Sequence, residues 1–537
     1  MKFSFHCLAA LTAIGALSSG SVVAETWKLS SGTANWVDAT NWLENSVPNS
    51  VGAAALFTLP TANRNIDLNG SFTVGSVTFD NTGTNSSTQN IRNFNVSGDL
   101  LTFDAPGAGP ATITSSGTAA TNSRIQSDMY FADSVDVVVS NTVGNSTAGA
   151  LSLTGNITGP GGMNKKGDGL LTTAFNAGDT TQVKEYQGAT TLTGGRWRSS
   201  LGGIPTKTSS FTINGGQLDL ITNNSTYTLG VGPLNLNGFG ATSGPFAAFP
   251  GAIRQDTGLV ETITNNVVFQ SDASIAMFGS ATSLTLTGSI SGPGRFYLDA
   301  AAGQPTNHGT LTITGANNST GGTSVVQGTL VVGPGSSLGI GNVLVDGASD
   351  RGGGIFGSGK LVVQTGATNA IADTATLTLT GGANGGTINL AAGIDDTVGG
   401  LILGGVTQTS AGTYGSMTSS ATFKSDYFLG DGVVRLLAPP GVPGDYNGNG
   451  TVDAADYVLW RNGGPLQNEV DNPGTVDSND YSAWRARFGN TSGSGAGLGQ
   501  GTAVPEPTTL ALVAIISGSL AIKSRRRFIL LMQARTI

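Results

Sequence analysis

Short segments of alternating aliphatic and hydroxyl residues, each ended by a glycine cluster, run through most of this 537-residue chain. Two of them, LSLTGNITGPGG at 151–162 and LTLTGSISGPGR at 284–295, align without a gap. Alternation with period two gives a strand one buried face and one solvated face, and glycines supply turns that need a positive φ. The repetition therefore predicts many strands of roughly four to six residues joined by short turns.

The composition narrows the fold class. Glycine accounts for 82 residues and charged residues for only 11%, unlike a helix-rich enzyme or a charge-rich disordered chain. An array of β-sandwiches and a β-solenoid both remain open. We favour a β-solenoid over residues 25–438, because one repeat buries little apolar surface whereas stacked repeats share a continuous core. Coils of roughly 20–25 residues at about 4.8 Å spacing would give a rod on the order of 80–100 Å long.

The N-terminal part of this region carries Trp27, Trp36 and Trp42 within 25 residues that otherwise hold few large side chains. An uncovered end of a stack of strands recruits further strands, so a cap is needed. Large aromatic side chains cover such an end efficiently, and we expect these three to do so. The alternative is that they are surface tryptophans that stack on sugars.

Several segments carry a resemblance to a known family. FTVGSVTFDN at 72–81, the two Gly-Pro-Gly segments and the stretch 401–437 are similar to autotransporter-associated β-strand repeat proteins. The resemblance covers about 400 residues and is degenerate, since Gly/Thr-rich β sequences imitate one another. It implies a surface-exposed, adhesin-like rod, with extracellular glycan as an expected partner.

The stretch GDYNGNGTVDAADYVLWRNGG at 444–464 gathers oxygen-bearing side chains at every second position. In a twelve-residue EF-hand loop, positions 1, 3, 5, 7, 9 and 12 supply the calcium ligands and a glycine at position 6 allows the sharp turn. Gly450 falls at position 6. The predicted ligands in the same order are Asp445, Asn447, Asn449, Thr451, Asp453 and Asp456. The alternative is a polar turn of Asp and Asn residues without a metal.

No helix can enter this loop, because Pro439, Pro440 and Pro443 precede it. Only an exiting helix over 454–462 is expected, and position 12 is Asp instead of Glu. A loop followed by one helix, with Asp in the last position, resembles type I dockerin modules. The resemblance extends over residues 444–489.

A second half follows 24 residues later, where VDAADYVLWR at 452–461 recurs as VDSNDYSAWR at 476–485. The second loop is degenerate because its position 5 is Pro473, which has no side-chain oxygen, and we expect weak or absent calcium there. Its predicted ligands are Glu469, Asp471, Thr475, Asp477 and Asp480. Four aromatic side chains at matching helix positions are expected to pack the two halves together, namely Tyr457, Trp460, Tyr481 and Trp484.

The dockerin resemblance also implies a partner. Dockerins bind cohesins through loop positions 10 and 11, which here are Ala454-Ala455 and Ser478-Asn479. The two pairs differ, so two equivalent binding modes are not expected. Calcium-dependent folding of the module does not require a cohesin, and Ca²⁺ is the expected cofactor.

Both ends of the chain have the features of targeting segments. Residues 1–24 combine Lys2, an apolar run and Val22-Val23-Ala24, which predicts a signal peptide and hence export. Near the other end, the apolar segment 508–522 is followed by Lys523 and Arg525-Arg526-Arg527, as in a transmembrane helix with a cytoplasmic end.

Val504-Pro505-Glu506-Pro507 precedes that apolar segment. The order of this motif, the apolar segment and the basic cluster resembles the PEP-CTERM sorting signal over 504–537. The resemblance implies an exosortase-type sorting enzyme as a partner and a location in the cell envelope or at the cell surface, with release after C-terminal processing. An ordinary C-terminal membrane anchor is the alternative, and it gives the same topology.

Charge and motif content exclude some functions. A net charge of −8 argues against a nucleic-acid partner, and the single cysteine, Cys7, allows no intramolecular disulfide. No GxSxG, HExxH or P-loop signature occurs. We therefore expect a non-catalytic protein. The alternative is a β-helix lyase or glycoside hydrolase that acts on polysaccharides, whose charged candidates are Lys165, Lys166, Asp168, His308, Asp395 and Asp396.

The predicted order is thus a signal peptide (1–24), a β-solenoid rod (25–438), a Pro-rich joint (439–443), a small α-helical dockerin-like calcium module (444–489), a Gly/Ser linker (490–503) and a sorting signal with a transmembrane helix (504–537).

Overall fold

The computed structural model describes residues 23–93, 98–140, 150–173, 183–247, 251–256, 258–299, 308–349, 357–437, 442–470 and 474–491. The chain divides into two compact units, Met1–Leu437 (unit 1) and Ala438–Ile537 (unit 2), and each is described by itself. The predicted signal-peptide core, the joint prolines Pro439 and Pro440, and the sorting motif with its apolar segment lie outside the described residues. No helix within the described ranges is long and apolar enough to cross a membrane.

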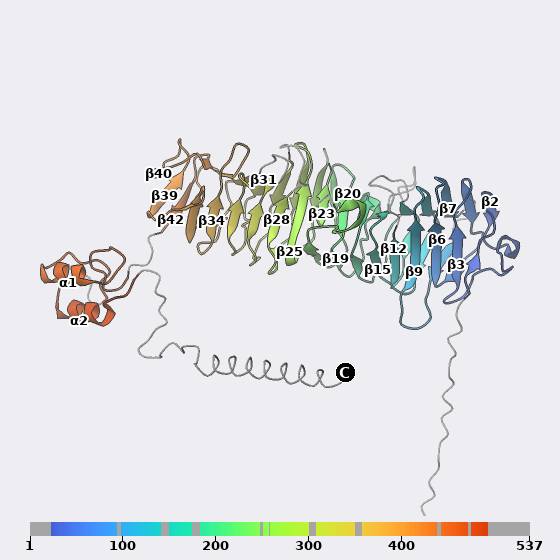
Figure 1. Cartoon of the computed structure of the whole chain (residues 1–537), viewed down its shortest axis with the longest axis horizontal. Coiled ribbons are helices and arrows are strands. Elements are labelled where there is room, and N and C mark those ends of the chain that lie inside the picture. Colours follow the sequence, from blue (N-terminus) through green and yellow to red (C-terminus); the bar gives the residue numbers. More distant parts are fainter. Residues whose placement is uncertain are drawn as a thin grey trace, which may run out of the picture. The chain divides into compact units, whose positions relative to one another are not determined.

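Unit 1 is mainly β, with large parallel sheets whose strands follow one another in chain order (Figure 1). Its 26-stranded sheet consists of two ladders of parallel strands that share the long strand β25. Ladder 1 comprises β1 (Glu25–Thr26), β3 (Ala54–Thr58), β6 (Ser76–Asn81), β9 (Ala111–Gly117), β12 (Val135–Val139), β15 (Met163–Lys166), β17 (Thr190–Leu192), β19 (Phe211–Asn214), β22 (Leu234–Gly238), β25 (Val267–Met277) and β27 (Ile290–Ser291). Ladder 2 comprises β2 (Gly32–Asn35), β4 (Arg64–Asp67), β7 (Thr88–Arg92), β10 (Asn122–Ile125), β13 (Leu151–Leu153), β16 (Leu170–Thr172), β18 (Arg196–Ser199), β20 (Gln217–Leu220), β23 (Ile253–Gln255), β25, β28 (Phe296–Asp299), β30 (Thr323–Val325), β32 (Val343–Val345), β34 (Thr376–Leu379), β37 (Gly400–Leu403) and β38 (Val406–Thr407).

Three smaller sheets complete unit 1. Ladder 3 comprises β5 (Phe72–Val74), β8 (Leu100–Phe103), β11 (Asp128–Phe131) and β14 (Ile157–Thr158). Ladder 4 comprises β21 (Ser225–Tyr227), β24 (Val260–Ile263), β26 (Ser283–Leu286), β29 (Thr310–Ile313), β31 (Gln327–Val332), β33 (Ser358–Val363), β35 (Thr387–Leu390) and β41 (Phe428–Leu429). The terminal sheet comprises β36 (Asp395–Val398), β39 (Gly412–Gly415), β40 (Phe423–Lys424) and β42 (Val433–Leu436). Three short 3-10 helices lie among the strands, η1 (Ala39–Asn41), η2 (Leu201–Gly203) and η3 (Gly244–Phe246).

From β6 to β14 the chain visits three ladders in rotation. Strands β6, β7 and β8 belong to ladders 1, 2 and 3, and they are followed in the same order by β9, β10 and β11 and then by β12, β13 and β14. One passage of the chain through the ladders is called a round. Each strand pairs in parallel with the strand of the same ladder in the preceding round, as β10 does with β7, β11 with β8 and β12 with β9. Strands β15–β20 alternate between ladders 1 and 2, β21–β29 include ladder 4 as the third ladder, and β30–β35 alternate between ladders 2 and 4. This arrangement is compatible with the predicted β-solenoid.

The length of one round varies more than the sequence predicted. Leu151 pairs with Leu171, 20 residues later, whereas Asp219 pairs with Arg254, 35 residues later. The predicted range of about 20–25 residues is therefore too narrow. The longer round contains η3 in the connection between β22 and β23, so extra residues lie between strands and leave the register intact.

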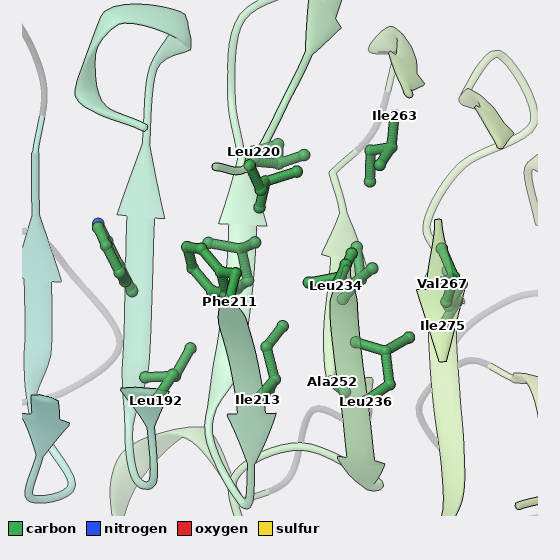
Figure 2. Packing of buried hydrophobic residues seen from close by; sticks show 14 of the residues in the cluster. Leu192, Phe211, Ile213, Leu220, Leu234, Leu236, Ala252, Ile263, Val267 and Ile275 are labelled. Atoms are coloured by element: carbon green, nitrogen blue, oxygen red, sulfur yellow. The ribbon is translucent and has the colours of Figure 1, made fainter. Parts of the chain in front are cut away.

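Inward-facing side chains form one continuous hydrophobic cluster from Trp27 to Leu436. Figure 2 shows part of it, in which Leu192, Ile213 and Leu236 follow one another across β17, β19 and β22. All three are fully buried, and burying one leucine-sized side chain stabilises a protein by about 1.5–3 kcal/mol. In-register parallel pairing thus places like residues above like residues.

The three N-terminal tryptophans are buried within the first strands. Trp27 and Trp36 pack edge-to-face on Trp42, with ring centroids 5.0 and 4.9 Å away, and all three rings lie beside Phe57 of β3. They are at most 3% exposed, so the alternative of surface tryptophans for sugar stacking is wrong. Their burial beside the first strands fits the expected cap.

The opposite end of unit 1 changes strand direction. Among the described strands, antiparallel pairing occurs between β37 and β38 and between β39 and β42, all within residues 400–436. Strands that turn back on themselves use hydrogen-bonding groups that would otherwise face outward. These turned-back strands lie in the segment 401–437, where ladder 2 ends.

Glycines in the repeated segments have a steric role. Gly155 and Gly288 occupy matching positions in the two aligned copies, and a Cβ there would lie 1.9 Å from the Ser127 carbonyl oxygen and 2.0 Å from that of Asn265. Gly159 and Gly292, also matched, have φ of +114° and +110°. The conserved spacing of the motif within this chain therefore follows from the close approach of one round to the next.

We predict that Gly288→Ala destabilises unit 1 by about 3 kcal/mol, because a backbone carbonyl would have to move to admit the methyl group. Gly109→Ala is the matched control, since a Cβ at Gly109 meets nothing within 4 Å. Thermal unfolding followed by circular dichroism measures the difference. Equal melting temperatures for the two variants would contradict the steric explanation.

Candidate calcium loops and charged strand rows

The described residues of unit 2 form the helices α1 (Ala454–Arg461) and α2 (Ser478–Arg487), each preceded by one of the predicted loops. The expected exiting helix over 454–462 is present and ends one residue earlier, with Asn462 as its C-cap. Asp453 and Asp477 are the N-caps, and each forms a capping box with the acid three residues later. The cap stabilises both helix N-termini without help from a metal.

The first loop wraps around two buried carboxylates. Asp445 accepts hydrogen bonds from the backbone N–H groups of Asn449 (3.1 Å) and Gly450 (2.7 Å). Asp456 accepts from the N–H groups of Asn447 (2.9 Å) and Asp453 (2.7 Å). Positions 1 and 12 of the predicted loop thus lie at its centre, and they hold the backbone of positions 3, 5, 6 and 9.

The other predicted ligands of this loop lie nearer to solvent. Asn447 and Asn449 accept from the N–H groups of Asn449 and Thr451 at 2.9 Å each, in successive side-chain turns. Asp453 accepts from Ala455 N at 2.8 Å, and Thr451 is half-buried. These bonds also occur in a polar turn without a metal, so hydrogen bonding alone does not separate the two hypotheses.

The burial of two acidic side chains distinguishes the calcium loop from a polar turn better than the hydrogen bonds do. Asp445 is 2% exposed and Asp456 is fully buried, and neither carboxylate forms an ion pair within the described residues. Buried carboxylates are stable when they are paired or when they coordinate a metal. Two buried acids at loop positions 1 and 12 are therefore a donor set that suits a hard divalent cation such as Ca²⁺.

The second loop repeats this arrangement in part. Glu469 at position 1 accepts from Gly474 N at 2.6 Å, and Asp480 at position 12 accepts from Asp477 N at 2.8 Å. Thr475 is exposed, and Asp471 lies outside the described residues, as does Pro473. Asp480 is fully buried, and none of the described residues forms a hydrogen bond with its Oδ1 atom.

The two halves hold each other through reciprocal contacts. Trp460 Nε1 of α1 donates to the carbonyl oxygen of Asp477 (2.7 Å), and Trp484 Nε1 of α2 donates to that of Asp453 (2.8 Å). The rings of Tyr457 and Tyr481 lie between them, with centroids 5.1–5.9 Å from their neighbours on the other helix. The predicted packing of the four aromatic side chains between the halves is confirmed.

Within the described part of the chain, no three His, Cys, Asp or Glu side chains form a group that could hold a metal. The predicted first loop would also use asparagine and backbone oxygens besides its acids. Calcium binding therefore stays a prediction, supported by the buried acids.

The charged candidates of the enzyme alternative lie on different strands. Lys165 is fully buried on β15 and donates to the carbonyl oxygens of Lys166, Gly167 and Gly194 at 2.7–3.0 Å. Lys166 pairs with Asp136 at 2.6 Å, and Asp168 accepts from Ser243 Oγ at 2.9 Å. These contacts are structural in character.

The remaining candidates lie farther along the chain. Asp395 pairs with Arg435, and Asp396 accepts from Ile371 N at 2.8 Å, both acids being on β36 of the terminal sheet. His308 forms an isolated bridge with Phe278 beside ladder 4. Asp395, Asp396 and His308 do not stand in one row across neighbouring strands with the lysines of β15.

A charged row that the sequence reading missed lies on ladder 2. Arg198 pairs with Asp219 at 2.8 Å and with Asp256 at 2.9 Å, and Asp256 also pairs with Arg254 at 2.7 Å. Arg198, Asp219 and Arg254 are directly opposed on β18, β20 and β23. Aligning the rounds in register would have revealed this row, because the three residues share one strand position.

Glu261 on β24 is an acid of unit 1 that is only 2% exposed. Burial raises its pKa to about 7, a rise that the nearby side chains of Gln255 and Tyr227 reduce. Near neutral pH the Glu261 side chain is therefore partly protonated, whereas an exposed glutamate with a pKa of 4.5 is ionised.

In comparisons with known proteins, no family model, curated protein or solved structure significantly matches this chain.

We predict that Glu261→Gln stabilises unit 1 at pH 8 and changes little at pH 4. Between pH 4.5 and about 7 the folded chain keeps a proton that the unfolded chain releases, so the native protein loses stability as pH rises through this window. A neutral glutamine avoids that loss, which is on the order of 3 kcal/mol. Melting temperatures at both pH values test this, and a pH-independent difference would contradict it.

Proposed function

We propose that this chain is an exported, surface-anchored β-solenoid rod that ends in a calcium-dependent, dockerin-like module. The rod provides length and an exposed face, and the module provides a domain that folds when calcium is present. The chain itself carries out no catalysis in this proposal. The location rests on the sequence features of residues 1–24 and 504–537.

The observation that carries the calcium proposal is the pair of unpartnered charges in matching places of unit 2. Asp456 and Asp480 both stand at loop position 12, both are fully buried, and neither has a cationic partner in the described residues. One Asp480 oxygen has no hydrogen-bond partner among the residues that the structure describes. A cation bound in a loop would satisfy the acid at position 12 of that loop, and Ca²⁺ prefers such oxygen ligands.

Each residue has a defined part in this proposal. Asp445, Asn447, Asn449 and Asp456 would hold Ca²⁺ through side-chain oxygens, Thr451 through its carbonyl oxygen, and Asp453 by way of a water. Calcium supplies positive charge that offsets the repulsion between the buried acids. The chain's own residues contribute the hydrogen bonds that shape the loop before the metal arrives.

The solenoid proposal is supported by the rotation of the chain through its ladders and by its continuous core. Many short strands add up to a large stable unit because each round contacts the rounds on both sides. A β-sandwich array would give separate cores with mostly antiparallel pairs. The parallel pairs of unit 1 favour the solenoid.

A cohesin-type partner is a second candidate function of unit 2. Ala454, Ala455, Ser478 and Asn479, at loop positions 10 and 11, are all exposed at the starts of the helices. A surface that recognises a partner must be accessible in this way. Because the two pairs differ in sequence, we expect at most one dominant binding mode.

We predict that the full chain, after removal of divalent ions, releases or absorbs heat when Ca²⁺ is titrated in, and that the melting transition of unit 2 rises. Calcium at one hundred times its dissociation constant would stabilise the module by about 2.7 kcal/mol. Titration calorimetry and circular dichroism in chelator and in calcium measure both effects. The absence of both heat and a melting shift would overturn the metal assignment.

A matched pair of variants locates the site. Asp456→Ala should abolish the heat of the stronger site, because it removes the buried acid that closes the first loop. Asp426→Ala, at an exposed position of unit 1, removes the same charge and should leave the titration unchanged. Equal heats from the two variants would place any bound calcium elsewhere.

A further inference from the structure

Ladder 2 carries an open hollow that none of the roles above uses. It has a volume of about 330 Å³ and lies over β10, β13, β16 and β18. Its lining consists of Asn122, Arg124, Ala150, Ser152, Thr172, Arg198 and Ile221. Strand order and register therefore fix where each of these side chains stands.

Four of the lining residues form a single row across the strands. Arg124 is opposed to Ser152, and Thr172 is opposed to Arg198. Ser152 and Thr172 are themselves register partners. The two arginines thus stand three strand steps of about 4.8 Å apart, or about 14 Å, with two hydroxyl residues between them.

The guanidinium groups at the two ends differ in their surroundings. Arg198 uses Nε and Nη2 for its ion pairs with Asp219 and Asp256, which fix its orientation, and its side chain is 26% exposed. Arg124 is half-buried and makes no ion pair with any described residue. Arg124, without an ion pair among the described residues, stands at one end of the row, and Arg198, whose Nη1 takes no part in its two ion pairs, stands at the other. Both can donate hydrogen bonds to anionic groups, because guanidinium N–H groups bind carboxylates well.

Two hydroxyl groups lie between the arginines. Ser152 Oγ and Thr172 Oγ1 lie 2.6 Å apart and share a hydrogen bond, and Asn122 adds an amide. Among the described lining residues no side chain is aromatic, and Ala150 and Ile221 are aliphatic. Most of the exposed lining is carbon, so the surface offers a few hydrogen bonds to sugar hydroxyls and apolar area to the face of a sugar ring.

We propose that this hollow binds a segment of an acidic polysaccharide that lies across the strands, with carboxylate groups at Arg124 and Arg198 and sugar hydroxyls over Ser152 and Thr172. A linear chain with regularly spaced charges fits a row whose own spacing is set by the strands. The net charge of −8 repels polyanions in general, so attraction has to come from this local pair of arginines. The same net charge disfavours a nucleic acid, which needs a broad basic surface.

The inference concerns unit 1 and does not depend on calcium. If the calcium titration of unit 2 fails, the hollow and its arginines are unchanged. If glycan binding fails, the rod and the calcium module stand as proposed. The two sets of experiments therefore fail separately.

The test is binding of polygalacturonate oligomers to the full chain, measured by titration calorimetry at low and moderate salt. Neutral cello-oligosaccharides and a single-stranded oligonucleotide serve as the other probes. We expect binding of the acidic oligomers that weakens with salt, and no comparable binding of the other two. Equal binding of the neutral sugar, or binding of the oligonucleotide as tight as that of polygalacturonate, would overturn the proposal.

Arg124→Gln removes one guanidinium and should weaken polygalacturonate binding by about tenfold or more, as expected for a charge-assisted hydrogen bond. Lys360→Gln is the matched control, because Lys360 is an exposed cation on β33 of ladder 4 with the same charge. Circular dichroism melts establish that both variants are folded. If the two variants bind alike, or if the wild-type chain does not bind polygalacturonate, the hollow is not the site we propose.

Discussion

Parallel, in-register hydrogen bonding between successive rounds of chain is the interaction on which unit 1 depends. It fixes which side chains stand above one another, so that leucine lies on isoleucine in the core and arginine faces serine on the outer surface. It also brings backbone carbonyls so close to the turns that several positions admit only glycine. Core, turns and outer rows are thus consequences of one register.

The low charge of the chain follows from the same constraint. A parallel ladder aligns identical faces, so like charges at one strand position would face each other at about 4.8 Å. The outer rows of ladder 2 carry many hydroxyls and amides, and the directly opposed charges of Arg198 and Asp219 form an ion pair. Charged residues therefore cluster where opposite signs alternate.

Much of this could be predicted from the sequence. Period-two alternation and the repeated Gly-Pro-Gly segments indicated a repetitive β fold, and the Asp-Ala-Ala-Asp pattern located α1 to within one residue. The longer rounds could not be predicted, because inserted connections such as that around η3 leave no periodic signal. The ladder 2 row was missed for a related reason: Arg124, Ser152, Thr172 and Arg198 are separated by unequal intervals and become neighbours only through register.

The crossed tryptophans of unit 2 have a consequence for how its two loops communicate. Trp460 is bonded to the residue that caps α2, and Trp484 to the residue that caps α1, so neither loop can rearrange without disturbing the opposite helix. A cation bound in the first loop would therefore also stabilise the conformation of the degenerate second loop. One occupied site would then be enough to order both halves of unit 2. In that case the module still folds although Pro473 removes a ligand from the second loop.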